Sequence, residues 1–322
     1  MRAGRDCPLD YRLPREAFAG APLFDCDTLY VLGGLYGNRQ ALAAAQRLLA
    51  AEPAARAVFN GDAHWFDRDP AIFQAVEQGL AGHLALRGNV ETELGRGADS
   101  GAGCGCAYPM SVDDAVVARS NAIQAELNET VRGLPGMAAC LAERPVSALV
   151  SVGGRRVAIS HGDERSLAGW GCSRESLSAP ARRQQLDAWF AASGVQVLAT
   201  SHTCAAVALD LANGALINNG AAGLPNFADG RYGLLSRIAT RPHPHALYRC
   251  ERDGLFIEAL ALDYAHDAFV ADFDRQWPAG SPAALSYRAR LLGVGLEPPA
   301  AALLGGFTLN SHSGCAPETH IG

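Results

Sequence analysis

Short apolar runs alternate along the chain with stretches of helical periodicity, and the apolar runs predict buried β-strands. Single strands are predicted at residues 27–32, 83–87 and 232–238, and in the apolar runs that begin at Val58, Val197 and Leu216. Two β-hairpins are predicted at 148–161 and 246–262, because a glycine-containing turn separates the runs of each pair. Helices are predicted from the turn after Asn38 through Leu49, at 70–80 and at 186–192. Strands mixed with helices in this way predict an α/β fold.

Three parts of the chain fall outside this regular pattern. Residues 1–25 contain three prolines and little periodicity, which predicts an arm over a main domain at 26–265. Residues 95–145 hold a glycine-rich loop and then a helix opened by Ser111, and we expect them to form a cap beside the site. Residues 266–322 are predicted to form a C-terminal helix and a loosely packed tail, because the tail is rich in proline, alanine and glycine.

Polar residues follow four of the predicted strands at the point where each strand ends. Asp62 follows the run that begins at Val58, and Asn89 follows the strand at 83–87. His161 ends the first hairpin, and His202 follows the run that begins at Val197. Open α/β sheets bind their ligands at the carboxyl ends of strands, so these four side chains are expected to meet.

In this order of motifs the chain resembles the calcineurin-like metallophosphoesterases. Their pattern runs Asp-x-His, Gly-Asp, Gly-Asn-His, a strand-end His and Gly-His-x-His, and the resemblance covers roughly residues 27–260. It implies a mixed two-sheet β-sandwich flanked by helices, in four layers of helix, sheet, sheet and helix. It also implies metal-dependent hydrolysis of a phosphate mono- or diester, in which a hydroxide held by the metal attacks phosphorus.

The resemblance further implies a set of metal ligands. Asp62 matches the aspartate that bridges two ions, while Asn89, His161 and His202 complete the set of the second ion. One carboxylate, one amide oxygen and two imidazoles suit a divalent transition metal such as Mn, Zn, Fe or Co, and the set does not choose among them. One ion is expected, and a second is left open.

The ligands of the other ion are largely replaced. The family's Asp-x-His positions are occupied by Gly34 and Tyr36, and Cys204 stands in place of the second His of Gly-His-x-His. Cys204 is a candidate ligand as a thiolate, which would favour zinc. The alternative is that Cys204 is a small buried apolar residue beside the site.

The residues that would act on the substrate are less clearly marked. Val90 occupies the position of the family's usual catalytic His. His64 is a candidate ligand or acid, with helix capping or packing as the alternative. Arg87 is a candidate to pair with the phosphate, with a surface salt bridge as the alternative, and Asn89 is a catalytic candidate as well as a metal ligand. Glu91 and Asp163 are further candidates, each with a structural carboxylate as the alternative.

Composition narrows the classes of function and partner. All 27 basic residues are arginine, which excludes mechanisms that need a lysine, and the net charge of −6 gives no reason to expect nucleic acid as a partner. No apolar run approaches the length of a membrane span and no signal peptide is evident, so a cytoplasmic protein is expected. Nine cysteines without regular spacing favour reduced thiols.

Three hypotheses for function follow from the sequence. The first is a metallophosphoesterase acting on a small-molecule phosphate ester. The second is a catalytically impaired relative that binds a metal, a ligand or a partner. The third is a rebuilt metal centre, formed with Cys204 and His64, whose chemistry is not phosphoryl transfer. Weaker candidate clusters are the Cys104 and Cys106 pair and, in the tail, His312, Cys315 and His320. The sequence does not indicate an oligomeric state.

Overall fold

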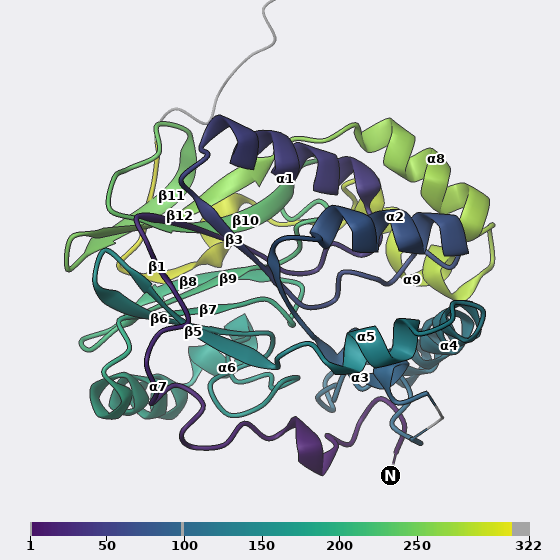
Figure 1. Ribbon diagram of the computed structural model, residues 1–322, viewed down its shortest axis with the longest axis horizontal. Coiled ribbons are helices and arrows are strands. Elements are labelled where there is room, and N and C mark those ends of the chain that lie inside the picture. The colour runs from purple at the N-terminus through teal and green to yellow at the C-terminus, as the bar shows by residue number, and fades with distance from the viewer. Residues whose placement is uncertain (1, 98–99, 311–322) are drawn as a thin grey trace, which may run out of the picture.

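A computed structural model describes residues 2–97 and 100–310 of the chain. Two seven-stranded sheets face one another and helices cover both outer faces (Figure 1). This four-layer arrangement confirms the α/β sandwich expected from the sequence. The tightest part of the core lies between the sheets, where inward-facing Val, Ile and Leu side chains such as Val31, Val58 and Ile159 are fully buried.

The first sheet is mixed, with parallel pairing among three strands and antiparallel pairing among the rest. Its strands, in spatial order, are β14 (Thr308–Leu309), β11 (Ala246–Arg252), β12 (Leu255–Leu262), β10 (Gly233–Ala239), β2 (Thr28–Leu32), β3 (Arg56–Asn60) and β4 (Leu84–Leu86). The parallel strands β2, β3 and β4 are connected by helices, as parallel pairing requires.

The second sheet is also mixed. Its strands, in spatial order, are β1 (Asp25–Cys26), β5 (Ser147–Val152), β6 (Arg155–Ser160), β7 (Val197–Thr200), β9 (Ala215–Asn219), β8 (Ala206–Asp210) and β13 (Leu303–Gly305). Parallel pairing of β6, β7 and β9 brings the carboxyl ends of these strands to one edge of the sandwich.

Helices on each outer face bury an apolar stripe against the sheet beneath them. On the first sheet these are α1 (Arg39–Ala51) and α2 (Pro70–Leu80), and on the second sheet α6 (Arg174–Ser178) and α7 (Pro180–Ser193). Asn38 caps α1 and Asp69 caps α2, each by accepting a hydrogen bond from a main-chain N–H of the first turn.

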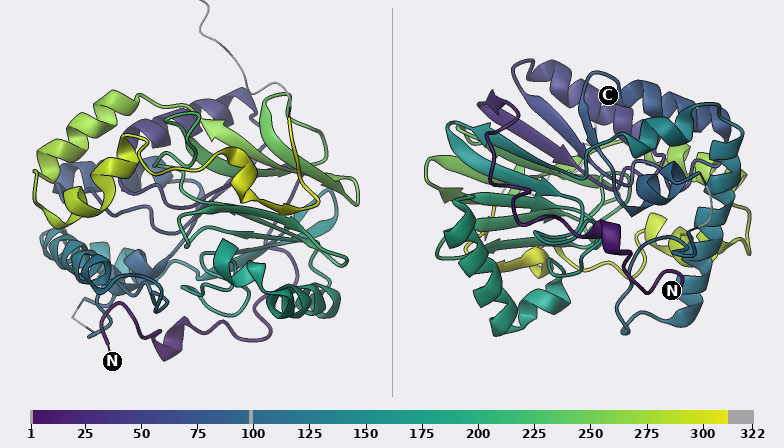
Figure 2. Two further views of the ribbon diagram at one scale, coloured as in Figure 1. Left: turned by 180° about the vertical axis from the view of Figure 1, so that it is seen from behind. Right: turned by 60° about the horizontal axis from the view of Figure 1, so that its bottom comes forward.

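A second group of helices packs beside the carboxyl ends of the strands, around its own apolar core (Figure 2). It consists of α3 (Asn89–Gly95), α4 (Asp114–Arg132), α5 (Met137–Ala142), α8 (His266–Gln276) and α9 (Pro282–Leu291). Trp65, Phe66 and Trp277 are buried in this core. Two short 3₁₀ helices, η1 (Leu9–Tyr11) and η2 (Pro299–Ala302), complete the described elements.

Both predicted hairpins are present, with turns at Gly153 and Gly154 and at Asp253 and Gly254. The cap helix begins at Asp114, with Asp113 as its N-cap, and not near Ser111 as the sequence suggested. Asp113, and not Ser111, caps the helix because its carboxylate accepts a hydrogen bond from the N–H of Ala115.

The predicted loose tail needs a correction for residues 303–309. These residues form β13 and β14, which pair with β8 and β11 and so extend one sheet each. Ala302 and Phe307 are buried in the core between the sheets. Burial of these two side chains outweighs the composition of the surrounding tail. The tail candidates His312, Cys315 and His320 lie outside the described residues.

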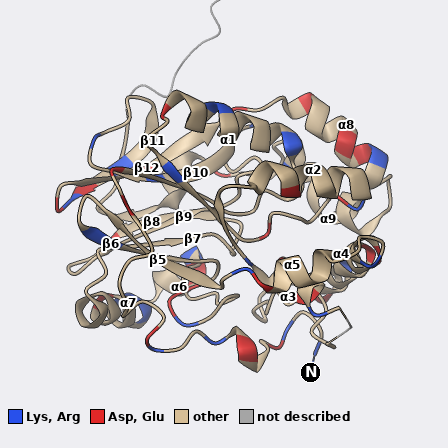
Figure 3. Cartoon of the chain, viewed as in Figure 1, with Lys and Arg blue, Asp and Glu red and all other residues tan. Residues whose placement is uncertain are grey.

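Surface properties give few clues to a partner. Arginines and acidic residues are interspersed over the helices and loops (Figure 3). Within the residues searched, 2–97 and 100–310, no helix has the length and apolar character needed to cross a bilayer. All eight cysteines in that part of the chain are free thiols.

Candidate metal centre

Four polar side chains reach the edge of the sandwich from four different strand ends. Asp62 follows β3, Asn89 is the first residue of the helix after β4, His161 follows β6 and His202 follows β7. Two of them therefore come from the first sheet and two from the second. All four side chains are buried.

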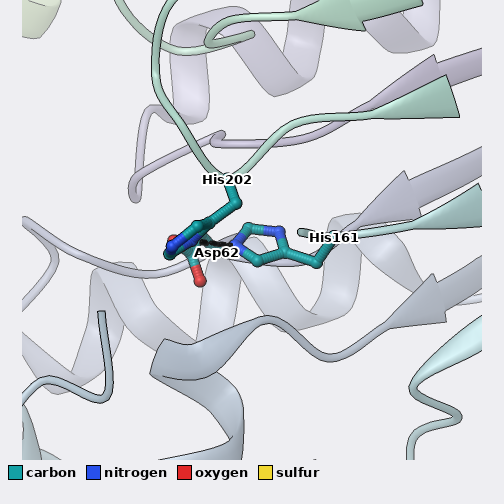
Figure 4. A group of neighbouring side chains, drawn as sticks. All are labelled: Asp62, His161 and His202. Carbon is teal, nitrogen blue, oxygen red and sulfur yellow. Dashed lines mark hydrogen bonds and ion pairs between the residues drawn. The ribbon is translucent and has the colours of Figure 1, made fainter. Parts of the chain in front are cut away.

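Three of these residues converge on one point (Figure 4). One potential ligand atom from each of Asp62, His161 and His202 lies within 4.8 Å of the others. His161 Nε2 is 3.3 Å from Asp62 Oδ2 and 3.2 Å from His202 Nδ1. Ligands of a tetrahedral ion with metal–nitrogen bonds near 2.05 Å are roughly 3.3 Å apart, so the spacing fits a bound metal ion.

Hydrogen bonds to main-chain carbonyls determine which nitrogens point at this centre. His161 Nδ1 is 2.7 Å from the carbonyl oxygen of Asn60, and His202 Nε2 is 3.0 Å from that of Cys106. A carbonyl only accepts, so these two nitrogens carry protons, and the other nitrogen of each neutral ring presents a lone pair to its neighbour. Two lone pairs and a carboxylate meeting in a buried place require a proton or a cation between them.

The charge balance of the cluster is consistent with this requirement. Burial lowers the pKa of His161, but the Asp62 carboxylate raises it by more, so the net shift is upward. Burial and the charge on His161 lower the pKa of His202 to about 3. Burial raises the pKa of Asp62, but His161 outweighs this effect and the net shift is downward. These shifts favour a charged carboxylate at Asp62 beside a neutral imidazole at His202, which are donors that suit a metal cation.

Asn89 supplies a further acceptor. Its Nδ2 donates to the carbonyl of Cys104 at 2.9 Å, whereas its Oδ1 is buried and has no hydrogen-bond partner. A buried polar atom without a partner costs free energy unless something satisfies it. Asn89 and Asp62 line the same cavity. This buried oxygen without a partner suits the role of fourth ligand, which the sequence predicts for Asn89.

The other half of the site is filled by one side chain. Tyr36 is buried, and its hydroxyl oxygen is 2.6 Å from Cys204 Sγ. A Cβ atom added to Gly34 would lie only 2.9 Å from Cζ of Tyr36, so the phenol ring occupies the space next to Gly34. The Tyr36 side chain thus fills the space beside Gly34.

Both members of this pair are neutral. Burial raises the pKa of Tyr36 well above its ordinary value, and the neighbouring Cys204 and Asp62 raise it further. Burial also raises the pKa of Cys204. Among the described residues, Cys204 does not join the group of Asp62, His161 and His202. Burial, and not the contact with Tyr36, therefore favours a protonated Cys204 thiol over a thiolate ligand.

Backbone strain accompanies these positions. Tyr36, Asp62 and Cys204 have φ angles of 57°, 52° and 54°, in the left-handed region that non-glycine residues rarely adopt. Each such residue costs on the order of 1 kcal/mol, and strain of this kind collects at functional sites.

His64 does not face the site, in contrast to its predicted role as ligand or acid. Its Nδ1 is 2.6 Å from Asp67 Oδ2 and its Nε2 is 2.7 Å from Glu77 Oε1. Its ring stacks on Phe73 with centroids 3.6 Å apart. Burial lowers the pKa of His64, but the two carboxylates raise it to about 9. Both nitrogens are engaged, so neither is free to bind a metal or protonate a substrate.

Arg87 also points away from the cavity. Its Nη1 donates to the carbonyl of Ala142 at the end of α5, and it does not line the cavity. The prediction that Arg87 contacts a phosphate is corrected accordingly. The physical reason is that the segment after α5 holds Arg87 by two hydrogen bonds, since the Arg87 guanidinium donates to the carbonyl of Ala142 and its main-chain N–H to that of Pro145.

The two further carboxylate candidates have structural roles. Glu91 is fully buried and accepts hydrogen bonds of 2.8 Å from the N–H groups of Asp62, Ala63 and Gly88. Asp163 accepts from the N–H groups of Arg165, Ser166 and Gly171. Glu91 therefore fixes the turn that presents Asp62, and Asp163 closes the loop after His161.

A cavity of about 140 Å³ lies over the candidate ligands. Asp62, Asn89 and His202 form its polar wall. The rest is lined by Tyr36, Trp65, Val90, Cys106, Tyr108, Trp170, Thr203, Cys204 and Tyr287. It is therefore a small, largely aromatic chamber with its polar groups gathered at one side.

Sequence patterns did not indicate the aromatic wall or the carbonyl contacts. Trp170 and Tyr287 come from a loop and a helix far along the chain, and no motif connects them to the strand ends. The carbonyls of Asn60 and Cys106 orient both histidines, yet every residue has a carbonyl. Only the arrangement in space reveals these contributions.

The fold resembles that of two solved structures. One is a hypothetical protein from Pyrococcus horikoshii, with a TM-score of 0.56 and 14% identity over 80% of this chain and 97% of that one. The other is a metallophosphoesterase from Sphaerobacter thermophilus, with a TM-score of 0.52 and 15% identity over 84% of this chain and 100% of that one. The sequence itself matches no protein-family model and no curated protein. At this level of identity the likeness shows the fold alone: the chain has the fold of a metallophosphoesterase.

Proposed function

We propose that the chain is a divergent member of the calcineurin-like metallophosphoesterase family that binds one divalent transition-metal ion and hydrolyses a phosphodiester. Asp62, Asn89, His161 and His202 would hold the ion. A divalent metal at this place would activate a water molecule and polarise the phosphoryl group.

The observation that carries the proposal is the meeting of two imidazole lone pairs beside a carboxylate. The 3.2 Å approach of His161 Nε2 and His202 Nδ1 is unfavourable in a buried site unless a positive charge lies between them. The unpartnered Oδ1 of Asn89 adds a fourth acceptor. These donor atoms suit a transition metal with mixed oxygen and nitrogen ligands.

Charge favours a phosphodiester over a phosphate monoester. Among the described residues that line the cavity, none is an arginine, and Asp62 is the one carboxylate. One divalent ion and one carboxylate leave a single positive charge. A phosphodiester carries one negative charge, whereas a monoester carries about two at neutral pH. The single positive charge of the proposed site therefore balances the single negative charge of a phosphodiester.

Neutral hydroxyl groups complete the cavity. Tyr36, Tyr108 and Tyr287 line it, and burial raises the pKa of each phenol. All three remain protonated at neutral pH and are able to donate hydrogen bonds to phosphoryl oxygens. Since Val90 occupies the position of the family's usual acid, a substrate with a good leaving group is expected to react fastest.

A second candidate function is ligand binding without turnover. The Tyr36 and Cys204 pair occupies the space beside Gly34, and among the described residues that line the cavity the one imidazole is His202, a candidate metal ligand. On this alternative the protein binds one metal and an anionic ligand on a phosphoesterase fold.

Metal content of the purified protein tests the metal centre. After loading with Mn or Zn and removal of excess ion, plasma mass spectrometry is expected to find about one ion per chain. His161→Ala should lose the ion, and Cys204→Ser should keep it. His245→Ala is the control, because His245 is exposed and remote from the cluster. A folded wild-type protein without metal would overturn the proposal.

Hydrolysis distinguishes the two candidate functions. The metal-loaded protein is expected to cleave an activated aryl phosphodiester faster than the matching monoester, and Asn89→Ala should abolish this activity. One bound metal without turnover of either ester, with several metals, would favour the ligand-binding alternative. Faster cleavage of the monoester would contradict the charge argument.

A further inference from the structure

A loop of the cap contacts the candidate metal ligands through its main chain. The carbonyl of Cys104 accepts a hydrogen bond from Asn89 Nδ2 at 2.9 Å, and the carbonyl of Cys106 accepts one from His202 Nε2 at 3.0 Å. Trp170 Nε1 donates to the same Cys106 carbonyl at 2.9 Å. The loop belongs to the cap and not to the sandwich, yet it reaches two of the four candidate ligands.

We propose that this loop, residues 104–106, is a positioning element that selects the ligand atoms which Asn89 and His202 present to the metal. The proposal rests on the metal centre proposed above. An amide has an oxygen face and a nitrogen face, and a neutral imidazole has two tautomers, so each side chain has a wrong state as well as a right one.

Each carbonyl excludes one of the two states of its partner, which are the two orientations of the Asn89 amide and the two tautomers of His202. The Cys104 carbonyl requires the NH₂ group of Asn89, which turns Oδ1 away from the loop and leaves it without a partner. The Cys106 carbonyl requires a proton on Nε2 of His202, which leaves Nδ1 as the lone pair that faces His161. Contacts of this kind behind the ligands commonly alter metal affinity by about 10–100-fold.

The loop is itself fixed from the side opposite the ligands. The N–H of Cys104 donates to Asn121 Oδ1 of α4 at 3.0 Å. Gly105 has a φ of +64°, and a Cβ atom added there would lie 2.2 Å from the hydroxyl oxygen of Tyr11. That hydroxyl donates to Glu93 at 2.6 Å. A side chain at position 105 therefore has no space unless the loop or the Tyr11 side chain moves.

The N-terminal arm supports the same loop. The N–H of Gly4 donates to the carbonyl of Ala102, and the N–H of Tyr108 donates to the carbonyl of Gly4. Figure 2 shows the N-terminal segment running alongside the cap. Segments distant in sequence from the strand ends thus determine the place of the two carbonyls.

Gly105→Ala is the test variant, and Gly101→Ala is its matched control. Both glycines have a positive φ, so alanine introduces similar backbone strain at either position. A Cβ atom at Gly101 meets no atom within 4 Å, whereas one at Gly105 meets Tyr11. Asn121→Ala, which removes the acceptor of the Cys104 N–H, is the second variant if Gly105→Ala fails to fold. Circular dichroism and urea unfolding establish the folded state of each.

Two measurements follow on each folded variant. Two-bond ¹H–¹⁵N correlation spectra of the metal-free, histidine-labelled protein report the tautomer of His202, which is assigned with His202→Gln. We expect the Nε2–H form in wild type and in Gly101→Ala, and a mixture of tautomers in Gly105→Ala. Competition with a zinc chelator should show affinity about 10–100-fold weaker in Gly105→Ala and unchanged in Gly101→Ala.

The outcomes separate this proposal from the proposed function. A wild-type His202 in the Nδ1–H form, or a Gly105→Ala protein with unchanged tautomer and zinc affinity, would overturn the role of the loop while leaving the metal centre intact. Zinc binding that weakens as expected in a protein without phosphodiesterase activity would support the loop and overturn the hydrolase. A wild-type protein that binds no zinc would overturn both.

Discussion

Tyr36 fills the part of the candidate site that lies next to Gly34. Glycine at position 34 leaves room for a phenol ring, and the hydroxyl of that ring meets Cys204 where the family pattern has a histidine. The three substitutions are therefore complementary, because each accommodates the others.

Restoring the family's ligands should restore the second ion. We expect the triple variant Gly34→Asp, Tyr36→His, Cys204→His to bind two ions per chain, against one in wild type and in Tyr36→His alone. Aspartate at Gly34, where φ is +66°, costs about 1 kcal/mol, which a bound ion more than offsets. Metal analysis after gel filtration is the measurement. A folded triple variant with a single ion would argue against the replacement.

His64 is expected to matter for stability and not for metal binding. Its ring lies between Asp67 and Glu77, and Glu77 also pairs with Arg144. His64→Leu removes the buried cation that lies between the two carboxylates, which should reduce the free energy of unfolding by about 3–5 kcal/mol. Urea unfolding measures the loss.

An exposed ion pair provides the comparison for His64. Arg132 and Glu129 are 62% and 67% exposed, so Arg132→Ala should cost less than about 1 kcal/mol. His64→Leu that keeps wild-type stability but loses its metal would restore the ligand role which the hydrogen bonds of His64 exclude.

At the level of elements, the C-terminal strands close the sandwich. Phe307, between β13 and β14, is 7% exposed and its ring contacts Tyr248 edge to face at 6.3 Å. Phe307→Ala should therefore lower the free energy of unfolding by about 3 kcal/mol. Leu309→Ala, at a position that is 47% exposed, should change it by less than about 0.5 kcal/mol. Equal effects in urea unfolding would mean that this segment does not pack on the core in solution.

The elements that the sequence predicted well are those determined locally. Both hairpins carry their glycine turns between their strands, and the helix at 70–80 carries its cap and an N-terminal proline. β13 and β14 contain five residues in all and exist through pairing with β8 and β11, which lie far away in sequence. The local sequence of these two strands therefore does not predict their pairing.

The same distinction applies to the candidate site. The meeting of Asp62, His161 and His202 was predictable because each side chain carries its own chemistry and follows a recognisable strand. His64 and Arg87 were misplaced because sequence proximity to Asp62 and Asn89 says nothing about direction: Glu77 and Ala142 hold them elsewhere. The ring of Tyr36 and the carbonyls of the cap loop depend on neighbours that no spacing specifies.

In the whole molecule, the candidate ligands connect the two sheets. Asp62 and Asn89 extend from the first sheet, and His161 and His202 extend from the second. The cap also contacts this junction, because its loop is hydrogen-bonded to a candidate ligand from each sheet. An ion at this junction binds the folded chain and not the unfolded one, so metal binding and folding are linked.

This linkage predicts a metal-dependent melting temperature. An ion present at 100 times its dissociation constant stabilises the folded state by about 2.7 kcal/mol, which corresponds to roughly 4 °C for a chain of 322 residues. We expect calorimetry to show this rise for wild type with added Zn or Mn and its reversal by a chelator. His161→Ala should melt at the same temperature with and without metal, because it has lost one of the two ligands from the second sheet and should no longer bind the ion. A rise of the same size in His161→Ala would place the stabilising ion elsewhere on the molecule, and the two sheets would then be joined by packing alone.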